Sequence, residues 1–345
     1  MDIPFIYGKI AEKDNFTDRK EEQEILYQNF SCLINTVIIS PRRWGKTSLV
    51  NQVAQRFEQD KSTLICQIDI FNCRTEEQFY QTYANAVLRA NATVWEDFIT
   101  SARMTYDEIL ELPHTICRDT GKKMVICLDE FQNINEYEDS LAFQRKLRSH
   151  WQRHTDVCYC LYGSKRHMLL EIFNNYNMPF YKFGNIMFLQ KIQREEWIEF
   201  IMERFSNSGK AISKESCGLI ADLMKNHPYY TQQLSQQTWL RTTSEATPDI
   251  INKAFQDIIG QLSLLFANII DTLTPKQINF LIAVADGVTS FSTKETLAKY
   301  QLGTSANIKN LKKTATEKDL VDILPGNKIE LQDPVFEYWL KHCYR

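Results

Sequence analysis

The sequence predicts an α/β protein whose parallel sheet is followed by a helical region and a smaller C-terminal unit. Three observations support this fold class. A glycine-lysine-threonine loop at residues 40–48 lies between an apolar run and a helical pattern. Further apolar runs alternate with helical segments as far as residue 190. Beyond that point helical patterns follow one another without an intervening strand, so a second subdomain begins there.

The apolar runs of the first region are short and nearly continuous, as expected for strands that are buried on both faces. We expect strands at residues 36–39, 63–70, 123–128, 157–162 and 185–189. We expect helices at 20–30, 46–58, 75–91, 93–119, 140–153 and 165–176, the first capped by Thr17 or Asp18. Ser40, Asp129, Glu130 and Ser164 each follow a strand, and ligands of parallel sheets bind at that edge.

The loop Ser40-Pro41-Arg42-Arg43-Trp44-Gly45-Lys46-Thr47-Ser48 has the pattern of a phosphate-binding loop. Its backbone amides and the following helix N-terminus are expected to hold a β-phosphate. Lys46 would reach the β- and γ-phosphates, and the Thr47 hydroxyl would ligate Mg²⁺. Ser40 replaces the usual first glycine, which is unfavourable if the backbone there needs a positive φ. The alternative is a chance Gly-Lys-Thr on a surface helix.

Asp129 and Glu130 follow the apolar run at 123–128, some 80 residues after the loop. This is where a phosphate loop needs its acidic partner. Asp129 would hold Mg²⁺, and Glu130 would act as the base that activates water on the γ-phosphate. An acidic pair can also serve only as a helix cap after a strand. The presence of Glu130 favours hydrolysis over binding alone.

Ser164 follows the fourth predicted strand, which would lie beside the third. A short hydroxyl there can hold the attacking water or the γ-phosphate, but serine is also a common helix N-cap. Lys165, Arg166 and His167 add basic side chains at the same edge and can contact phosphate or remain solvated.

Composition is ordinary for a globular protein, with 43% hydrophobic and 24% charged residues. A net charge of −3 gives no overall bias toward nucleic acid. The nine cysteines include no Cys-x-x-Cys pair and read as reduced, mostly core residues. The N-terminus has no signal-peptide pattern, and no apolar run reaches the length of a membrane span. We therefore expect a cytoplasmic protein.

The remaining chain is predicted to be helical at 194–206, 213–225, 228–243 and 248–270, and then at 275–285, 293–300 and 304–316. Two strand-like pieces, 320–323 and 328–331, are joined by Pro325-Gly326-Asn327, a hairpin turn. Three helices and a hairpin give the order of a winged helix. We therefore predict a core at 1–190, a helical lid at 191–270 and a winged-helix domain at 271–345.

With these motifs the chain resembles the archaeal-type P-loop ATPases of prokaryotes, in the AAA+/STAND group related to origin-recognition ATPases. The resemblance covers nearly the whole chain. It rests on seven segments in order: 16–19, 41–48, 128–132, 163–164, 179–181, 226–230 and 333–340. It implies a three-layer P-loop NTPase core with a parallel sheet, a helical lid, a winged helix, and ATP with Mg²⁺ as ligands.

The resemblance also implies roles for single residues. The lead-in from Phe5 to Phe16 would pack near the adenine, and Pro228 would close over the base and ribose from the lid. Relatives often have an arginine after the segment at 179–181, where this chain has Lys182-Phe183-Gly184. Arg148, Arg153 and Arg166 are alternative candidates for a trans-acting arginine. Many relatives form rings or change between monomer and oligomer, so an oligomer is compatible with the resemblance.

The predicted helix at 304–316 is a candidate DNA-binding element. Lys309, Lys312, Lys313, Asn307 and Asn310 would face outward, where lysine can neutralise phosphate and asparagine can read adenine edges. Winged helices can also serve as protein-contact modules, and the acidic residues nearby suit a solvated face.

We therefore expect an ATPase that hydrolyses ATP with Mg²⁺ and uses the nucleotide state to move lid and winged helix against the core. Two alternatives remain open: a protein-recruiting switch with negligible turnover, and a DNA-binding regulator in which ATP only sets the conformation.

Overall fold

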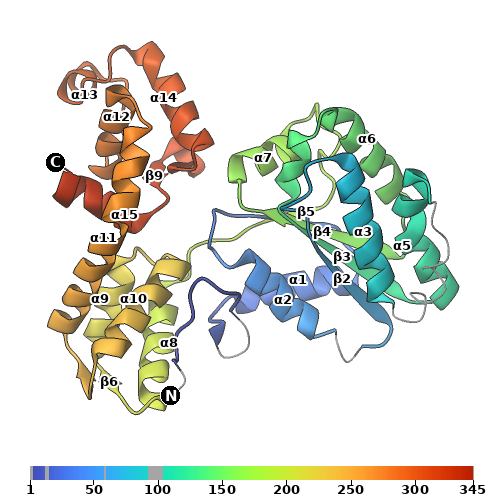
Figure 1. The fold of residues 1–345 in the computed structure, drawn as a ribbon, viewed down its shortest axis with the longest axis horizontal. Coiled ribbons are helices and arrows are strands. Elements are labelled where there is room, and N and C mark those ends of the chain that lie inside the picture. Colours follow the sequence, from blue (N-terminus) through green and yellow to red (C-terminus); the bar gives the residue numbers. More distant parts are fainter. Residues whose placement is uncertain (1–2, 12–14, 58–59, 92–103, 345) are drawn as a thin grey trace. The chain divides into compact units, whose positions relative to one another are not determined.

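The computed structural model describes residues 3–11, 15–57, 60–91 and 104–344. They divide into two compact units (Figure 1). The first, which we call the sheet unit, runs from Ile10 to Gln190. The second, the helical unit, combines the described residues before Ile10 with the chain from Lys191 onward.

A parallel sheet lies at the centre of the sheet unit, with five strands among the described residues. They are β1 (Thr36–Ile39), β2 (Thr63–Asp69), β3 (Lys123–Asp129), β4 (Val157–Gly163) and β5 (Asn185–Phe188). Their order is β2-β3-β4-β1-β5, so β4 lies between β1 and β3. Ile39 pairs with Gly163, and Asp69 pairs with Asp129. The strands therefore end together, and the segments after β1, β3 and β4 share one edge.

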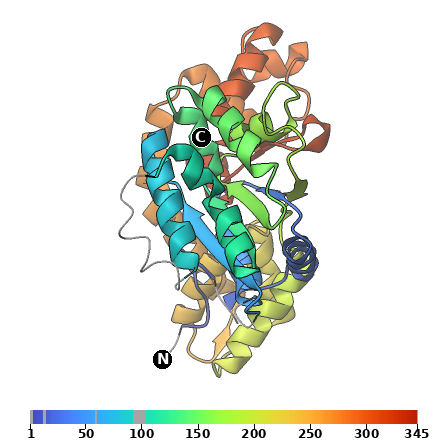
Figure 2. The ribbon, with the colours of Figure 1, turned by 90° about the vertical axis from the view of Figure 1, so that its right-hand side faces the viewer.

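Helices cover both faces of this sheet and give the predicted three layers. α1 (Lys20–Ser31) and α2 (Lys46–Gln55) pack on one face, against a core that includes Cys127, Cys158 and Cys160. The other face is covered by α3 (Glu76–Ala90), α5 (Tyr106–Thr120), α6 (Ser140–Trp151), α7 (Arg166–Asn174) and the 3₁₀ helix η2 (Phe131–Glu136). Figure 2 looks onto that second face, with helices in front of the strands. Burial on both faces explains the continuous apolar runs in the sequence.

The start of α1 differs from the prediction. Neither Thr17 nor Asp18 is the N-cap; Arg19 holds that position, with φ 62° and no side-chain cap. Asp18 also has a positive φ of 57°. Two consecutive left-handed residues therefore shift the cap beyond the polar pair. Part of the helix predicted at 93–119 lies outside the described residues, and so does residue 58 at the end of the helix predicted at 46–58.

The helical unit begins with four helices that match the predicted lid segments. They are α8 (Arg194–Asn207), α9 (Lys214–Leu223), α10 (Pro228–Arg241) and α11 (Pro248–Asp271). The expectation that no strand lies between them is wrong, because β6 (Ala211–Ile212) pairs with β7 (Glu245–Ala246). Strands of two residues are too short to produce an alternating pattern, so the sequence gives no sign of them.

The last part of the helical unit has the predicted order of three helices and a hairpin. The helices are α12 (Pro275–Ala285), α13 (Lys294–Lys299) and α14 (Ser305–Glu317). β8 (Val321–Ile323) and β9 (Ile329–Leu331) pair antiparallel around η3 (Pro325–Asn327), where Gly326 and Asn327 have positive φ. The chain continues through α15 (Pro334–Trp339) and the π-helical turn η4 (Leu340–Tyr344), which were not predicted.

The predicted lid and winged-helix regions share one hydrophobic core. The long helix α11 belongs to both: Phe255 packs edge-to-face on Tyr338 at 4.8 Å, while Phe266 contacts Phe336 at 5.1 Å between ring centroids. Two polar contacts reach α15 from the segment around the start of α10. Lys225 forms an ion pair of 2.5 Å with Glu337, and the Tyr230 hydroxyl donates to Asp333, the N-cap of α15.

The N-terminal segment packs in the helical unit, whereas the sequence suggested a core from residue 1 to 190. Phe5 is fully buried, with its ring centroid 6.1 Å from that of Phe200 and 5.6 Å from that of Phe205. The Gln236 amide donates a 2.7 Å hydrogen bond to the carbonyl of Phe5. These contacts join segments that lie far apart in the sequence, and local sequence patterns do not predict such pairings.

Candidate functional site

The phosphate-binding loop connects β1 to α2 at the carboxyl edge of the sheet. The backbone turns through left-handed conformations at Arg43, with φ 62°, and at Gly45, with φ 86°. Gly45 is also the N-cap of α2, where glycine adopts this conformation without strain. Ser40 is not among the residues with positive φ. The serine at the first loop position is therefore compatible with the turn, and the predicted steric penalty does not arise.

Lys46 is the first residue of α2, and its side chain folds back into the loop. Nζ donates to the carbonyls of Ser40 and Pro41, at 3.2 and 2.9 Å, and lies 3.3 Å from Ser40 Oγ. Lys46 is only 6% exposed. Burial lowers the pKa of its ammonium to about 8, although Asp129 and Glu130 oppose the shift. Among the described residues Lys46 makes no ion pair, so this buried cation suits an added anion.

Thr47 and Asp129 meet across the loop. Thr47 Oγ1 donates a 2.7 Å hydrogen bond to Asp129 Oδ2 at the end of β3. Burial raises the pKa of the Asp129 carboxyl to about 6, with a further contribution from Glu130, while the Thr47 bond opposes it. A hydroxyl and a carboxylate are the oxygen donors that Mg²⁺ prefers. The donor set therefore fits a nucleotide phosphate with its metal ion.

Glu130 lies next to Asp129, in a left-handed conformation with φ 57°. Its Oε2 accepts from the backbone amide of Ser164 at 3.1 Å and from the Ser164 hydroxyl at 2.9 Å. The amide of Gln132 donates to the same oxygen at 2.5 Å. Glu130 occupies the N-cap position of η2, where its side chain makes no cap hydrogen bond, although Asp129 Oδ1 accepts from the Glu130 amide at 2.8 Å; the N-cap of α7 is Lys165 rather than Ser164. Glu130, Ser164 and the Thr47–Asp129 pair thus gather at one edge.

Arg19 binds the backbone of the loop through its guanidinium, a contact that was not predicted from the sequence. Its buried guanidinium donates to the carbonyls of Trp44 and Gln190, both at 3.0 Å, and pairs with Glu22. Gln190 follows β5, so Arg19 links the loop to the edge strand of the sheet. Of the other predicted loop contacts, Pro41, Trp44 and Ser48 are buried, while Arg42 and Arg43 are exposed. Ser48 Oγ accepts from the Ala11 amide at 3.0 Å.

Pro228 belongs to the helical unit, where it is the first residue of α10. Its predicted role over the nucleotide base is not tested by the geometry of the sheet unit and stays a prediction.

The three candidate arginines already have partners in the sheet unit. The Arg148 guanidinium lies 4.8 Å from the Phe183 ring centroid, within the segment where relatives often have an arginine. Arg166 lies 5.9 Å from the Phe188 ring, and Arg153 contacts Glu111 at 3.4 Å. A trans-acting role for any of them stays a prediction.

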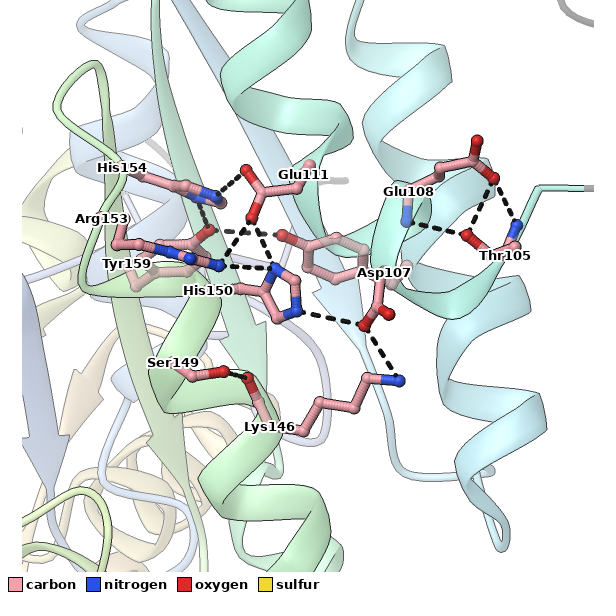
Figure 3. A network of polar contacts seen from close by, with 11 residues as sticks. Thr105, Asp107, Glu108, Glu111, Lys146, Ser149, His150, Arg153, His154 and Tyr159 are labelled. Carbon is pink, nitrogen blue, oxygen red and sulfur yellow. Dashed lines mark hydrogen bonds and ion pairs between the residues drawn. The ribbon is translucent and has the colours of Figure 1, made fainter.

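Arg153 belongs to a polar network that joins α5 to α6 and β4 (Figure 3). Glu111 contacts His150 Nδ1 at 2.5 Å and His154 Nε2 at 3.3 Å, and His154 Nδ1 lies 2.7 Å from the Tyr159 hydroxyl. Burial lowers the pKa of His154 to about 4. Tyr159 is near the start of β4 and Ser164 follows its end, so the network lies away from the phosphate loop. No cluster of three or more His, Cys, Asp or Glu side chains that could hold a metal ion occurs among the described residues.

The comparisons with known proteins agree with this architecture. A family described as a probable winged helix domain matches residues 264–342, which begins within α11. The fold resembles a Walker-type ATPase of Pyrococcus abyssi, with TM-score 0.74 and 14% identity over 98% of this chain and 99% of that chain. It also resembles the Aeropyrum pernix ORC2 protein in ADPNP–ADP complexes (0.61, 14%, 98% of each chain). The ORC1 protein of the same organism, in complex with DNA, gives 0.54 and 13% over 96% and 94%.

The chain therefore has the fold of the Walker-type P-loop ATPases, with a C-terminal winged helix domain. The predicted fold class is confirmed, and the resemblance to archaeal ATPases is confirmed at the level of the fold. No curated protein sequence matches the chain. Over the described residues, none of the helices has the length and apolar character needed to cross a bilayer.

Proposed function

We propose that the sheet unit binds ATP with Mg²⁺ and hydrolyses it. The observation that carries this proposal is the buried Lys46 ammonium, held without an ion pair among the described residues, beside the Thr47–Asp129 hydrogen bond. A nucleotide phosphate would provide the missing counter-charge, and the loop amides at the start of α2 would bind it.

In this proposal Lys46 holds the β- and γ-phosphates, and Thr47 and Asp129 provide oxygen ligands for the metal. Mg²⁺, when bound, would neutralise charge on the phosphate oxygens. Glu130 accepts a proton from the attacking water, which bonds to the γ-phosphorus as the bond to the bridging oxygen of ADP breaks. Ser164 orients the water or the γ-phosphate. The shared hydrogen bonds of Ser164 and Glu130 support this pairing of roles.

We further propose that the helical unit moves as one body when the nucleotide state changes. Lys225 and Tyr230 lie on either side of Pro228 in the sequence. Lys225 pairs with Glu337 of α15, and Tyr230 donates to Asp333, the N-cap of α15. A displacement of the start of α10 would thus be transmitted directly to the winged helix. The lid at 191–270 and the winged helix at 271–345 would therefore move together as one rigid body.

Substitution of Glu130 tests the proposed hydrolysis. Glu130→Gln should reduce ATP turnover by at least about 100-fold while keeping nucleotide binding. Glutamine has the shape of the glutamate side chain but cannot accept the proton of the attacking water. Glu136→Gln is the matched control. Glu136 is an exposed carboxylate near the same edge, paired with Arg74 and Lys165, and its loss should leave turnover unchanged. If the wild-type protein binds ATP without measurable turnover, the protein-recruiting switch is the better account.

DNA binding by the winged helix is a second candidate function. The match to a winged helix domain and the exposed side chains of Lys309 and Lys313 on α14 support it. Lys312, also predicted to face outward, is half-buried, with its ammonium 5.5 Å from the Phe291 ring centroid. We therefore assign the phosphate contacts to Lys309 and Lys313, and ATP would set the conformation in which they engage.

A cytoplasmic location is also proposed. All nine cysteines are free thiols and most are buried, as expected for a protein of a reducing compartment.

A further inference from the structure

Gln132, two residues after Glu130, has no role in the proposed function so far. It is the second residue of η2 and is 1% exposed. Its Nε2 donates to Glu130 Oε2 at 2.5 Å and lies 3.3 Å from Asn133 Oδ1. Its Oε1 is buried without a hydrogen-bond partner among the described residues, so the amide is held through its N–H groups alone.

One oxygen of Glu130 therefore receives three donors: the Gln132 amide, the Ser164 backbone N–H and the Ser164 hydroxyl. Within the described part of the chain, Oε1 of Glu130 accepts no hydrogen bond. The carboxylate cannot turn without breaking all three bonds at once. Oε2 is thus the anchored oxygen, and Oε1 keeps its lone pairs for a proton of the attacking water.

Gly163 lies directly against the side chain of Gln132. A Cβ atom at position 163 would lie 1.9 Å from Gln132 Oε1. Gly163 is not among the residues with positive φ, so the backbone does not require glycine there. Glycine leaves room for the amide of Gln132 against the backbone at the end of β4, and a Cβ atom here would displace that amide.

We propose that Gln132 is a positioning residue for Glu130, which fixes one carboxylate oxygen so that the other faces the attacking water. This inference rests on the proposed ATP hydrolysis. Gln132 itself touches neither the phosphate nor the metal ligands in this view. It acts through Glu130, and its removal should affect turnover rather than binding.

The test compares two buried glutamines of the same unit. Gln132→Met keeps the side-chain length but removes the N–H donors. Gln144→Met is the matched control, because Gln144 is also fully buried and donates a 2.7 Å bond to Asn135 Oδ1, without contact to Glu130. We expect Gln132→Met to lower kcat for ATP by about 10- to 100-fold, with KM and nucleotide affinity within about twofold of wild type. Gln144→Met should keep the wild-type kcat.

A second variant provides a readout that lost packing alone would not change. Gln132→Glu has the same shape, but its carboxylate repels Glu130 when ionised and donates a hydrogen bond only when protonated. The ratio of its kcat to that of the wild type should therefore rise as the pH falls from 8 to 6. A ratio that is flat over this range overturns the inference, and so does a Gln132→Met variant with wild-type kcat.

The proposed hydrolysis and the proposed role of Gln132 can be rejected separately. If the wild-type protein shows no turnover at all, the proposed hydrolysis fails. If the wild type turns over and Glu130→Gln does not, while both Gln132 variants equal the wild type, only the role of Gln132 is rejected. Should Gln132→Met fold poorly, as judged by thermal unfolding and nucleotide binding, the pH dependence of Gln132→Glu decides the matter.

Discussion

Thr47 and Asp129 are joined by a hydrogen bond of 2.7 Å although 82 residues separate them in the chain. This bond joins the first turn of α2 to the end of β3. In the proposed site the hydroxyl and the carboxylate would bind the metal ion together.

The first prediction concerns the pH dependence of metal-assisted nucleotide binding. Because burial raises the pKa of Asp129 to about 6, the carboxyl is protonated at lower pH and Mg²⁺ must displace the proton. Nucleotide affinity measured with Mg²⁺ should fall as the pH is lowered from 7 to 5. Asp129→Asn should reduce this dependence, and excess EDTA should reduce it in the wild type; the remainder comes from protonation of the γ-phosphate itself. Equal pH dependence with and without Mg²⁺ would argue against Asp129 as a ligand.

The second prediction uses the buried charge of Lys46. Folding lowers its pKa to about 8, so at pH 7 the unpaired ammonium opposes folding. Lys46→Met should raise the free energy of unfolding of the nucleotide-free protein by about 1 kcal/mol, after allowance for its lost hydrogen bonds. In ATP at 100 times its Kd the order should reverse, since only the wild type gains about 2.7 kcal/mol from binding. Thermal unfolding of both proteins, with and without ATP, measures whether the order of their stabilities reverses.

The third prediction concerns acid stability and His154. Burial lowers its folded pKa to about 4 from an ordinary value of 6.5, so the unfolded chain takes up a proton between these values. The stability that His154 contributes is complete above pH 6.5 and is lost as the pH falls through this range. Between pH 7 and 5 it should decline by about 2 kcal/mol. Urea unfolding of His154→Gln should show a smaller decline, whereas His342→Gln, at an exposed position, should match the wild type.

The fourth prediction separates the lysines of α14. Alanine at both Lys309 and Lys313 should weaken binding by a similar factor for all DNA sequences. It should also lower the magnitude of the slope of log K against log salt by about 2. Lys312→Ala should instead act mainly on the stability of the winged helix, because its ammonium lies over Phe291. Fluorescence anisotropy over a salt series measures the slope. Unchanged binding in the double variant would reject α14 as the DNA contact.

The strands, the phosphate loop and the acidic pair could be predicted from sequence because each depends on local pattern. Strands buried on both faces leave continuous apolar runs, and Gly45-Lys46-Thr47 lies in the context that its chemistry requires. Asp129 and Glu130 then follow from the strand that carries them. The hairpin between β8 and β9 was equally visible, because Gly326 and Asn327 provide the positive φ angles of its turn.

Contacts between distant segments could not be predicted in this way. Arg19 reaches Gln190 over 171 residues, and Phe5 meets Gln236 over 231 residues. No periodicity in the sequence relates such positions. Gln132 was missed for a different reason. It lies in the motif at 128–132, but its contacts with Glu130 and with the backbone of Gly163 form only in the folded chain.

The burial of Phe5 among the aromatic rings of the helical unit has a consequence for the order of synthesis. The sheet unit is a continuous stretch inserted between two parts of the helical unit, so it can fold as soon as it leaves the ribosome. The first nine residues cannot. They must wait, with an exposed phenylalanine, until some 190 further residues have been added and α8 has been made. The helical unit is therefore completed last, when Phe5 is buried against the rings of α8.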